Sequence, residues 1–227
     1  MWMIIQIKSF VSHILSAILD TLFPPYCYMC KKEGESLCGE CLSSIKKPID
    51  TPYPYIISVY SFKDYRIKRI IYAIKYFHRK DLLAPLARAL ADTLSQEATV
   101  PQNVYVILPI PMPTIRRYIR GYNHAEAFAH DLVKYLHTVP SQEHGLRYCV
   151  DTTILTRISS KKRQVLTTSK RERLLNQRNA FMVRKDISGK NIILLDDVTT
   201  TGATLSEARR ILILHGAKSV RAYTIAH

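Results

Sequence analysis

The sequence predicts an α/β protein with a mainly parallel sheet and helices on both faces. Short apolar runs alternate along the chain with longer segments whose apolar residues recur at helical spacing. One buried-type run, residues 192–195, is followed by two aspartates, a loop of threonine and glycine, and a helix. The chain has 227 residues, 47% of them hydrophobic, which suffices for one buried core and a small appendage.

The individual elements follow from this periodicity. We expect strands over residues 55–62, 104–108, 181–183, 191–195 and 220–225, and helices over residues 64–76, 82–94, 122–136 and 204–215. Prolines at positions 48, 52 and 54 mark a linker before the first strand. The segment from Thr204 to Glu207 reads as a T-x-x-E capping box that begins the last helix, and Gly216 ends it.

The first 22 residues predict an amphipathic helix. They lack the basic start and small-residue cleavage site of a signal peptide, and Lys8, His13 and Asp20 interrupt the apolar run that a spanning helix needs. We favour docking of this helix on its own protein over lying on a membrane, because its polar face lacks the lysines typical of membrane helices. A cytoplasmic protein is expected, with the inner face of the cytoplasmic membrane as the alternative.

Four of the five cysteines share one segment with the spacing C-x2-C-x7-C-x2-C; they are Cys27, Cys30, Cys38 and Cys41. Two such pairs place four thiolates in a tetrahedron, the geometry of a structural Zn²⁺ site. Two disulfides would need an oxidising compartment, and a redox pair would not need the second motif. We predict a zinc module within residues 1–48, with tight turns at Gly34 and Gly39, and a main domain over residues 49–227. Cys149 is expected to be a buried free thiol.

The chain carries 33 Lys and Arg against 18 Asp and Glu, a formal net charge of +15. The basic residues gather in the stretches 63–80, 116–120 and 157–190. This excess favours an anionic partner, which charge alone does not identify among phosphates, nucleic acid and acidic membranes. Aromatic residues interleaved with these clusters are candidates for stacking on bases of single-stranded DNA, although half or more are expected in the core. They are Tyr65, Tyr72, Tyr76, Phe77, Tyr118 and Tyr122.

Asp196 and Asp197 follow a buried strand, and the carboxyl ends of parallel strands are where α/β sheets bind ligands. The next residues offer backbone N–H groups, hydroxyls and the positive end of a helix dipole, which suit a phosphate. They are Thr199, Thr200, Thr201, Gly202 and Ala203. Two carboxylates would repel that phosphate unless they bind another part of the ligand, and a ribose diol meets this need. The sequence therefore predicts a ribose 5-phosphate group; G-x-G-x-x-G and P-loop motifs are absent from it.

The segment "ILLDDVTTTGAT" resembles the phosphoribosyl diphosphate motif of type I phosphoribosyltransferases, and the whole chain resembles the ComF competence-protein family. The shared features include the four-cysteine module, "LPIPMP", "RRYIRGYNHAEAFA" and the series Gln164, Glu172, Arg173, Asn176, Ala180 and Phe181. This resemblance implies a type I phosphoribosyltransferase-like fold and a Mg²⁺ ion carried by the diphosphate. It places Asp196 and Asp197 on the ribose, and Thr200, Thr201, Gly202 and Thr204 on the 5-phosphate. His124, Thr199 and Lys161 depart from the family pattern, which has glutamine, an aliphatic residue and threonine there.

Phosphoribosyl transfer must exclude water, and the basic, hydroxyl-rich stretch 159–170 is the candidate lid. Candidate contacts to the diphosphate or to DNA are Arg116, Arg117, Arg120, Lys161, Lys162 and Arg163. No residue stands out as a general base, and His124 is better explained as a helix-start residue.

Three functions remain open. The resemblance implies natural transformation, in which single-stranded DNA is handled on the cytoplasmic side of the inner membrane, near the DNA-uptake machinery. The chain is then a DNA-uptake protein that binds phosphoribosyl diphosphate. The alternatives are a working phosphoribosyltransferase with an unidentified nitrogenous acceptor, and a ligand-gated regulator without turnover.

Overall fold

The computed structural model describes residues 24–51, 53–97, 104–138, 147–158 and 180–227. The chain divides into two compact units, Met1–Ser44 and Ile45–His227. Residues just before the expected boundary at 48 belong to the larger unit, since Ile45 is buried and the Lys46 N–H donates to Asp64. The expected N-terminal helix and the candidate lid lie outside the described residues. In the part of the chain that is described, no helix has the length and apolar character to cross a membrane.

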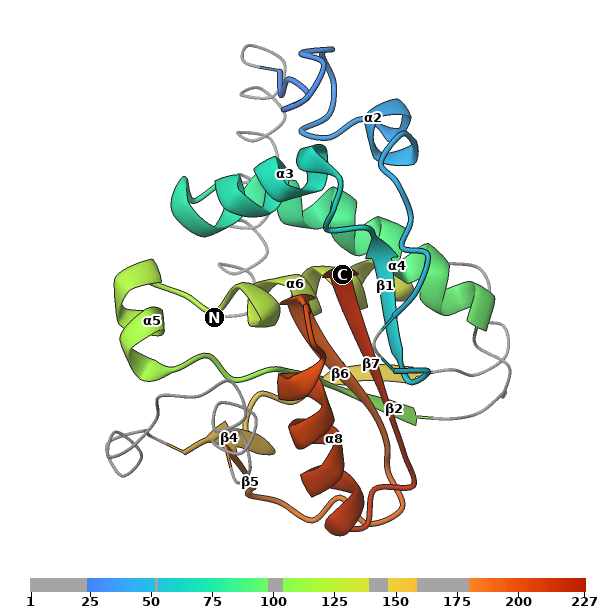
Figure 1. The fold of residues 1–227 in the computed structure, drawn as a ribbon, viewed down its shortest axis with the longest axis vertical. Helices are drawn as coiled ribbons and strands as arrows, with labels where there is room; N and C mark the ends of the chain where they lie inside the picture. The colour runs from blue at the N-terminus through green and yellow to red at the C-terminus, as the bar shows by residue number, and fades with distance from the viewer. Residues whose placement is uncertain (1–23, 52, 98–103, 139–146, 159–179) are drawn as a thin grey trace, which may run out of the picture. The chain divides into compact units, whose positions relative to one another are not determined.

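A five-stranded parallel sheet forms the centre of the larger unit (Figure 1). In spatial order its strands are β1 (Ile56–Tyr60), β7 (Ser219–Ala226), β6 (Asn191–Val198), β2 (Val104–Pro109) and β3 (Arg147–Val150). The central strand β6 pairs with both β2 and β7, and its residues 192–195 are all buried, as expected for a strand covered on both faces. The predicted α/β class with a mainly parallel sheet is confirmed.

Helices cover both faces of this sheet (Figure 1). α4 (Leu83–Glu97) and α6 (His124–Leu136) pack on each other at one face, and α8 (Ala203–Leu214) covers the other. The remaining elements of this unit are α3 (Tyr65–Tyr76), the 3₁₀ turn η1 (Lys80–Leu82), α5 (Thr114–Arg120), and the antiparallel pair β4 (Leu155–Arg157) and β5 (Phe181–Val183). The short strands β3 and β4 and the helix α5 were not predicted, because three to seven residues carry little periodic signal.

Two local predictions in the larger unit are wrong. The last helix begins at Ala203 and is capped by Gly202, so Thr204 is not its N-cap, and the Glu207 carboxylate binds Arg210 at 2.8 Å instead of closing a capping box. Gly202 has a left-handed φ of 69°, and its carbonyl accepts the Ser206 N–H. The N-cap therefore lies two residues before the position that the motif predicts. Cys149 is exposed, because it lies on the edge strand β3 next to the inward-facing Tyr148.

The smaller unit is described over residues 24–44. Tyr26 and Glu33 form a β-bridge around the first cysteine pair, and the short helix α2 (Gly39–Ser43) carries the last cysteine. Gly34 has a φ of 115°, so it makes the predicted tight turn, whereas Gly39 is the first residue of α2 and makes none.

Asp64 fixes the start of α3. Its carboxylate accepts the Arg66 N–H at 2.9 Å and the Lys46 N–H at 3.0 Å, and it pairs with the Arg66 guanidinium at 2.6 Å. These contacts, the guanidinium foremost, hold the pKa of the Asp64 carboxyl well below its usual range. One side chain therefore caps the helix and ties it to the chain that enters the larger unit.

We predict that Asp64→Ala lowers the free energy of unfolding by about 1–2 kcal/mol at neutral pH, because the cap and the Lys46 contact are both lost. The Asp64 pKa is depressed in the folded state, so its contribution is present above the unfolded pKa and is lost as pH falls below about 4. Urea unfolding of both proteins from neutral to acidic pH measures this difference. A difference that stays constant down to the lowest pH would contradict an ionised cap.

Candidate functional site

A cavity of about 370 Å³ opens at the carboxyl ends of β6 and β2. Its lining residues are Lys75, Ile110, Pro111, Met112, Pro113, Asn123, Ala125, Arg157, Asp196, Asp197, Val198 and Thr204. They come from α3, the loop after β2, the start of α6, β4, the end of β6 and the start of α8. Both predicted aspartates therefore face a cavity and not the protein interior, at the sheet edge where the sequence placed them.

The two aspartates lie within β6, which extends to Val198 and so runs past the predicted end at Leu195. Successive residues of a strand point to opposite faces, so Asp196 continues the face of Leu194 towards α8, and Asp197 continues the other face. The Asp197 carboxylate lies 2.7 Å from the Lys75 ammonium of α3. The Asp196 carboxylate accepts the Asp197 N–H at 2.9 Å.

Asp196 holds its proton unusually tightly. The residue retains some accessible surface at the cavity, yet protein encloses its carboxyl on the other sides. Burial raises the pKa of Asp196, and the negative charge of Asp197 raises it further, to about 7. Lys75 and Arg157 oppose this rise without cancelling it. The site thus has one paired carboxylate and one that gains from a hydrogen-bond donor.

The loop from β6 to α8 is folded by its own hydroxyls. The Thr199 N–H donates to Ala226 of β7, and the Thr199 hydroxyl accepts the Gly202 N–H at 3.1 Å. Thr199 and Gly202 are both buried, whereas Thr200 and Thr201 are exposed and Thr204 lines the cavity. In this conformation Thr199 and Gly202 shape the loop, and the hydroxyls of Thr200 and Thr201 remain at the surface.

Gly202 is also fixed by its surroundings. A Cβ atom at this position would lie 2.9 Å from Ile56 Cδ1 and 3.0 Å from the Tyr53 ring. The ring of Tyr53 stacks on Tyr55, whose hydroxyl is 2.8 Å from the Ser206 hydroxyl in the first turn of α8. Residues at and before β1 therefore pack against the loop, and a side chain at position 202 would force Ile56 or Tyr53 to shift and would strain the left-handed backbone.

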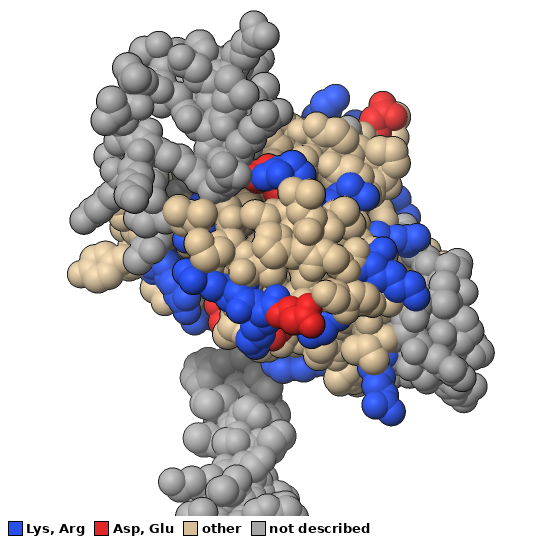
Figure 2. Space-filling model, turned by 90° about the horizontal axis from the view of Figure 1, so that it is seen from below, with Lys and Arg blue, Asp and Glu red and all other residues tan. Residues whose placement is uncertain are grey.

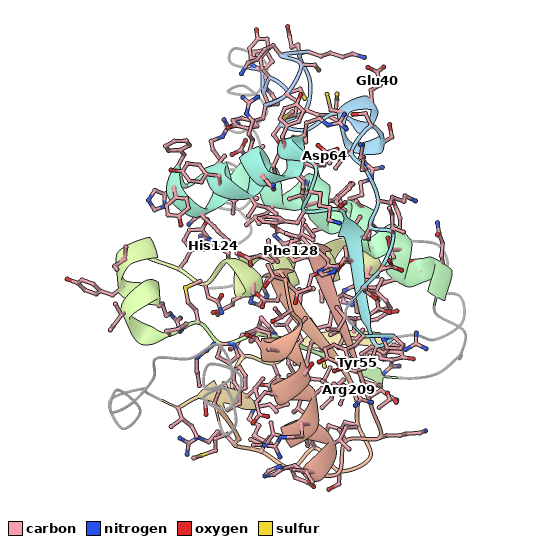
Figure 3. The ribbon with its side chains drawn as sticks, viewed as in Figure 1. Glu40, Tyr55, Asp64, His124, Phe128 and Arg209 are labelled. Atoms are coloured by element: carbon pink, nitrogen blue, oxygen red, sulfur yellow. The ribbon has the colours of Figure 1, made fainter. Side chains whose placement is uncertain are left out.

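Asn123 joins the proline-rich loop after β2 to the start of α6. Its side-chain amide donates to the Ile110 carbonyl and accepts the Ala125 N–H. His124 is the first residue of α6; it is 1% exposed, its ring meets that of Tyr122, and it lies one turn from Phe128 (Figure 3). His124 is absent from the cavity lining, which agrees with a structural place at the helix start.

Two cations that reach the cavity, Lys75 and Arg157, were not among the predicted ligand residues. Lys75 follows the buried Ile74 on α3, and Arg157 lies on β4, so only the folded chain shows that both meet the aspartates. Their sole sequence signal is membership of the basic stretches.

The predicted diphosphate or DNA contacts are only partly described. Arg117 on α5 is 62% exposed, lies 3.8 Å from Glu126 and lines a smaller cavity of about 110 Å³ beside the first. Arg116 and Arg120 belong to α5, but their side chains lie outside the described part, as do residues 161–163. Basic residues also predominate over acidic ones on the face of the molecule in Figure 2.

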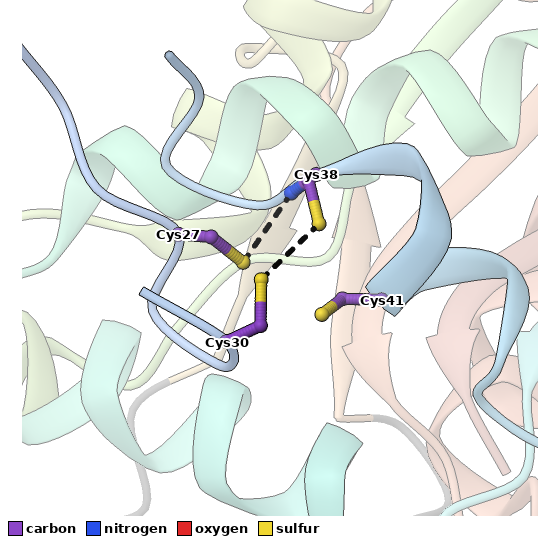
Figure 4. A group of neighbouring side chains, drawn as sticks. All are labelled: Cys27, Cys30, Cys38 and Cys41. Atoms are coloured by element: carbon purple, nitrogen blue, oxygen red, sulfur yellow. Dashed lines mark hydrogen bonds between the residues drawn. The ribbon is translucent and has the colours of Figure 1, made fainter. Parts of the chain in front are cut away.

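The four cysteines converge in the smaller unit (Figure 4). Their sulfur atoms all lie within 4.8 Å of one another, and Cys30 Sγ is 3.6 Å from Cys38 Sγ. Tetrahedral zinc with bonds of about 2.3 Å sets its sulfurs about 3.8 Å apart, so the cluster has suitable dimensions. Burial raises the pKa of the Cys27 thiol, but N–H donors, those of Cys30 and Cys38 foremost, outweigh it and lower that pKa to about 6.

A family model described as a phosphoribosyl transferase domain matches residues 123–227, the part that carries the acidic pair and the threonine loop. With the parallel sheet and its two helical layers, this match confirms the predicted phosphoribosyltransferase-like fold class. A solved hypoxanthine-guanine phosphoribosyltransferase from Bacillus anthracis matches 64% of this chain and 68% of its own chain, at 14% identity and a TM-score of 0.38.

Curated relatives match most of the chain. DNA utilization protein YhgH from Salmonella typhimurium is 27% identical over 88% of this chain and 82% of its own length. Competence protein F from Haemophilus influenzae is 24% identical over 89% and 84%. Competence protein ComFC from Bacillus subtilis is 30% identical over 74% of this chain and 62% of its own length.

The raised pKa of Asp196 generates a test. Its folded pKa lies above the unfolded value, so stability declines as pH rises from about 4 through about 7 and the carboxyl ionises. We predict that Asp196→Asn, which imitates the neutral acid, raises the free energy of unfolding by about 1–3 kcal/mol at pH 8 and has little effect near pH 4. Urea unfolding across this pH range measures the change.

The matched control is Asp197→Asn, which removes the partner of the half-buried Lys75 and is expected to destabilise the protein. An Asp196→Asn variant that is no more stable than the parent at pH 8 would show that ionisation of Asp196 does not destabilise the folded protein.

Proposed function

We propose that this chain, which belongs to the ComF family and carries a phosphoribosyl transferase domain, binds phosphoribosyl diphosphate and takes part in DNA uptake. The names of its relatives, which speak of competence and DNA utilization, support the cellular role. The observation that carries the ligand is the single cavity shared by Asp196, Asp197 and Thr204, beside the threonine loop. The proposed place of action is the cytoplasm, at the inner face of the cytoplasmic membrane, where incoming single-stranded DNA is handled.

The cavity offers a separate partner for each part of the ligand. Hydroxyls of the ribose diol donate to Asp196 and Asp197, which relieves the repulsion between the two carboxylates. The 5-phosphate accepts hydrogen bonds from Thr200, Thr201 and the first turn of α8, where the helix dipole favours negative charge. This division explains why acids and a phosphate-binding loop can be neighbours.

The diphosphate would lie towards the two cations of the cavity. Lys75 and Arg157 balance its negative charge, and a Mg²⁺ ion bound by the diphosphate would supply further neutralisation. Lys75 pairs with Asp197 in the ligand-free chain, so ligand binding must open or share this ion pair. Lys75 would therefore have an anionic partner both before and after the ligand binds.

Turnover is the second candidate function, favoured by the family model of a transferase domain. A nitrogenous acceptor would displace diphosphate from C1 of the ribose, and the nearby carboxylates would stabilise the positive charge that develops there. Among the described lining residues, the titratable groups are Lys75, Arg157 and the two aspartates, and none is a histidine. Diphosphate release in a screen of nucleobases separates a working enzyme from a binding protein or a ligand-gated regulator.

The acid doublet provides the decisive binding test. In calorimetric titration with phosphoribosyl diphosphate and Mg²⁺, Asp196→Asn with Asp197→Asn is expected to abolish binding, because the diol loses both carboxyl groups as acceptors. Thr204→Val is expected to weaken it by about tenfold, since one hydroxyl donor is lost. The matched control, Ser188→Ala, lies outside the cavity and should bind as the parent does. Full affinity in the double variant of a folded protein would refute the assignment.

We further propose that Cys27, Cys30, Cys38 and Cys41 hold one structural Zn²⁺ ion. Four converging thiols leave no open coordination position, so the metal would stabilise the smaller unit and not catalyse. The Cys27 environment of N–H donors is the kind that supports a metal-bound thiolate.

Cysteine replacement tests the zinc site. Cys38→Ser is expected to lose most of the bound zinc, measured by elemental analysis, and to expose the smaller unit to proteolysis. Cys149→Ser is the control, because its exposed thiol lies on β3 outside the cluster, and zinc content should not change. Purified parent protein without zinc, or equal loss in both variants, would contradict the proposal.

A further inference from the structure

Helix α3 has two chemically different faces. Its inward stripe is aliphatic and buried, at 0–4% exposure: Ile67, Ile70, Ile71 and Ile74. Its outward side carries aromatic rings that remain more than half exposed. Tyr72 is 53% exposed, Tyr76 55%, and Phe77, the C-cap residue, 64%. The aliphatic stripe is enough to anchor the helix, so the fold does not require these outward rings.

The three rings form a cluster, which we name the α3 platform: Tyr72, Tyr76 and Phe77. The Tyr72 and Tyr76 ring centroids lie 4.5 Å apart with an interplanar angle of 37°, and Tyr72 meets Phe77 edge-on at 5.6 Å. Mutual contact limits the rotamers of each ring in advance of binding. The result is a preformed aromatic surface that faces solvent.

Basic residues lie close to the platform in the chain. Lys68 and Arg69 are exposed on the same helix, and Lys80 is exposed in η1 just after it. The acids that flank this stretch in the sequence are paired, Asp64 with Arg66 and Asp81 with Arg79 at 2.7 Å. Exposed aromatic rings set among exposed basic residues complement a polyanion whose bases are free to stack.

From this arrangement, and resting on the proposed role in DNA uptake, we propose that the α3 platform stacks on bases of single-stranded DNA. The backbone phosphates would run over Lys68, Arg69 and Lys80. Stacking on rings tolerates any base sequence, as a protein handling incoming DNA requires, and it disfavours duplex DNA, whose bases are enclosed. The platform is distinct from the ribose site, because Lys75 on the same helix turns towards Asp197.

The experiment uses the full chain and a fluorescent oligothymidine of about 20 nucleotides, a length that covers an ordinary single-strand site. Anisotropy is measured from about 50 mM to about 500 mM salt. Tyr72→Ala with Tyr76→Ala is expected to weaken binding by about tenfold or more at each salt concentration. Tyr72→Phe with Tyr76→Phe retains the rings and is expected to bind as the parent does.

Two further measurements separate stacking from charge. An abasic oligonucleotide of equal length retains the phosphates, so its weaker binding should be the same for the parent and for the alanine variant. Oligomers with 5-iodouracil should cross-link under ultraviolet light to peptides of α3 in the parent. Titration with phosphoribosyl diphosphate should be unchanged in the alanine variant, which also shows that its larger unit is folded.

The outcomes distinguish the platform from the function on which it rests. Parent protein that binds DNA with a steep salt dependence, together with an alanine variant of equal affinity, would overturn the platform and leave the DNA contact in place. Parent protein without salt-dependent affinity for the oligomer would overturn the DNA contact itself and the platform with it.

Discussion

The site depends on the parallel pairing of β6 between β2 and β7. Because β6 is held on both sides and covered on both faces, its backbone can end only at the edge where its two neighbours also end. Asp196 and Asp197 therefore reach that edge together, one on each face of the sheet. The loop after β2, the start of α6 and the start of α8 converge on the same edge, and the cavity between them follows from the strand order.

This placement leaves an electrostatic imbalance that the protein only half resolves. Lys75 pairs with Asp197, whereas burial and the neighbouring charge raise the pKa of Asp196 to about 7. Burying charge without a full set of partners destabilises a fold, so a doublet retained for structure alone would be poorly explained. A ligand with two adjacent hydroxyl groups and an anionic tail would supply partners for both kinds of charge. Its hydroxyls would donate to the two aspartates, and its tail would pair with Lys75 and Arg157.

The elements with strong local patterns were predictable from the sequence, and the contacts between distant segments were not. The isoleucine stripe of α3 and the apolar run of β6 each fix an element and its buried face. Gly202 shows the limit: its place in the loop was predicted, but its left-handed backbone and its contact with Tyr53 depend on how β1 packs. The contact of Lys75 with Asp197 likewise joins segments that only the sheet brings together. Cys149 was expected in the core because free thiols are usually buried, and a four-residue edge strand gives no sequence signal to correct that expectation.

Helix α3 takes part in both the core and the two proposed sites, because its residues fall into three groups with different surroundings. Its isoleucines hold it to the domain, Lys75 reaches the acid doublet, and the rings of the α3 platform face solvent. A ligand that draws Lys75 away from Asp197 would act on the same helix that carries the platform. If the two proposed sites influence each other through this helix, the effect must be reciprocal: DNA changes ligand affinity by the same factor by which the ligand changes DNA affinity. If both proposed sites exist, the arrangement of α3 would give even a binding protein without turnover a physical means of linking the supply of phosphoribosyl diphosphate to the handling of DNA.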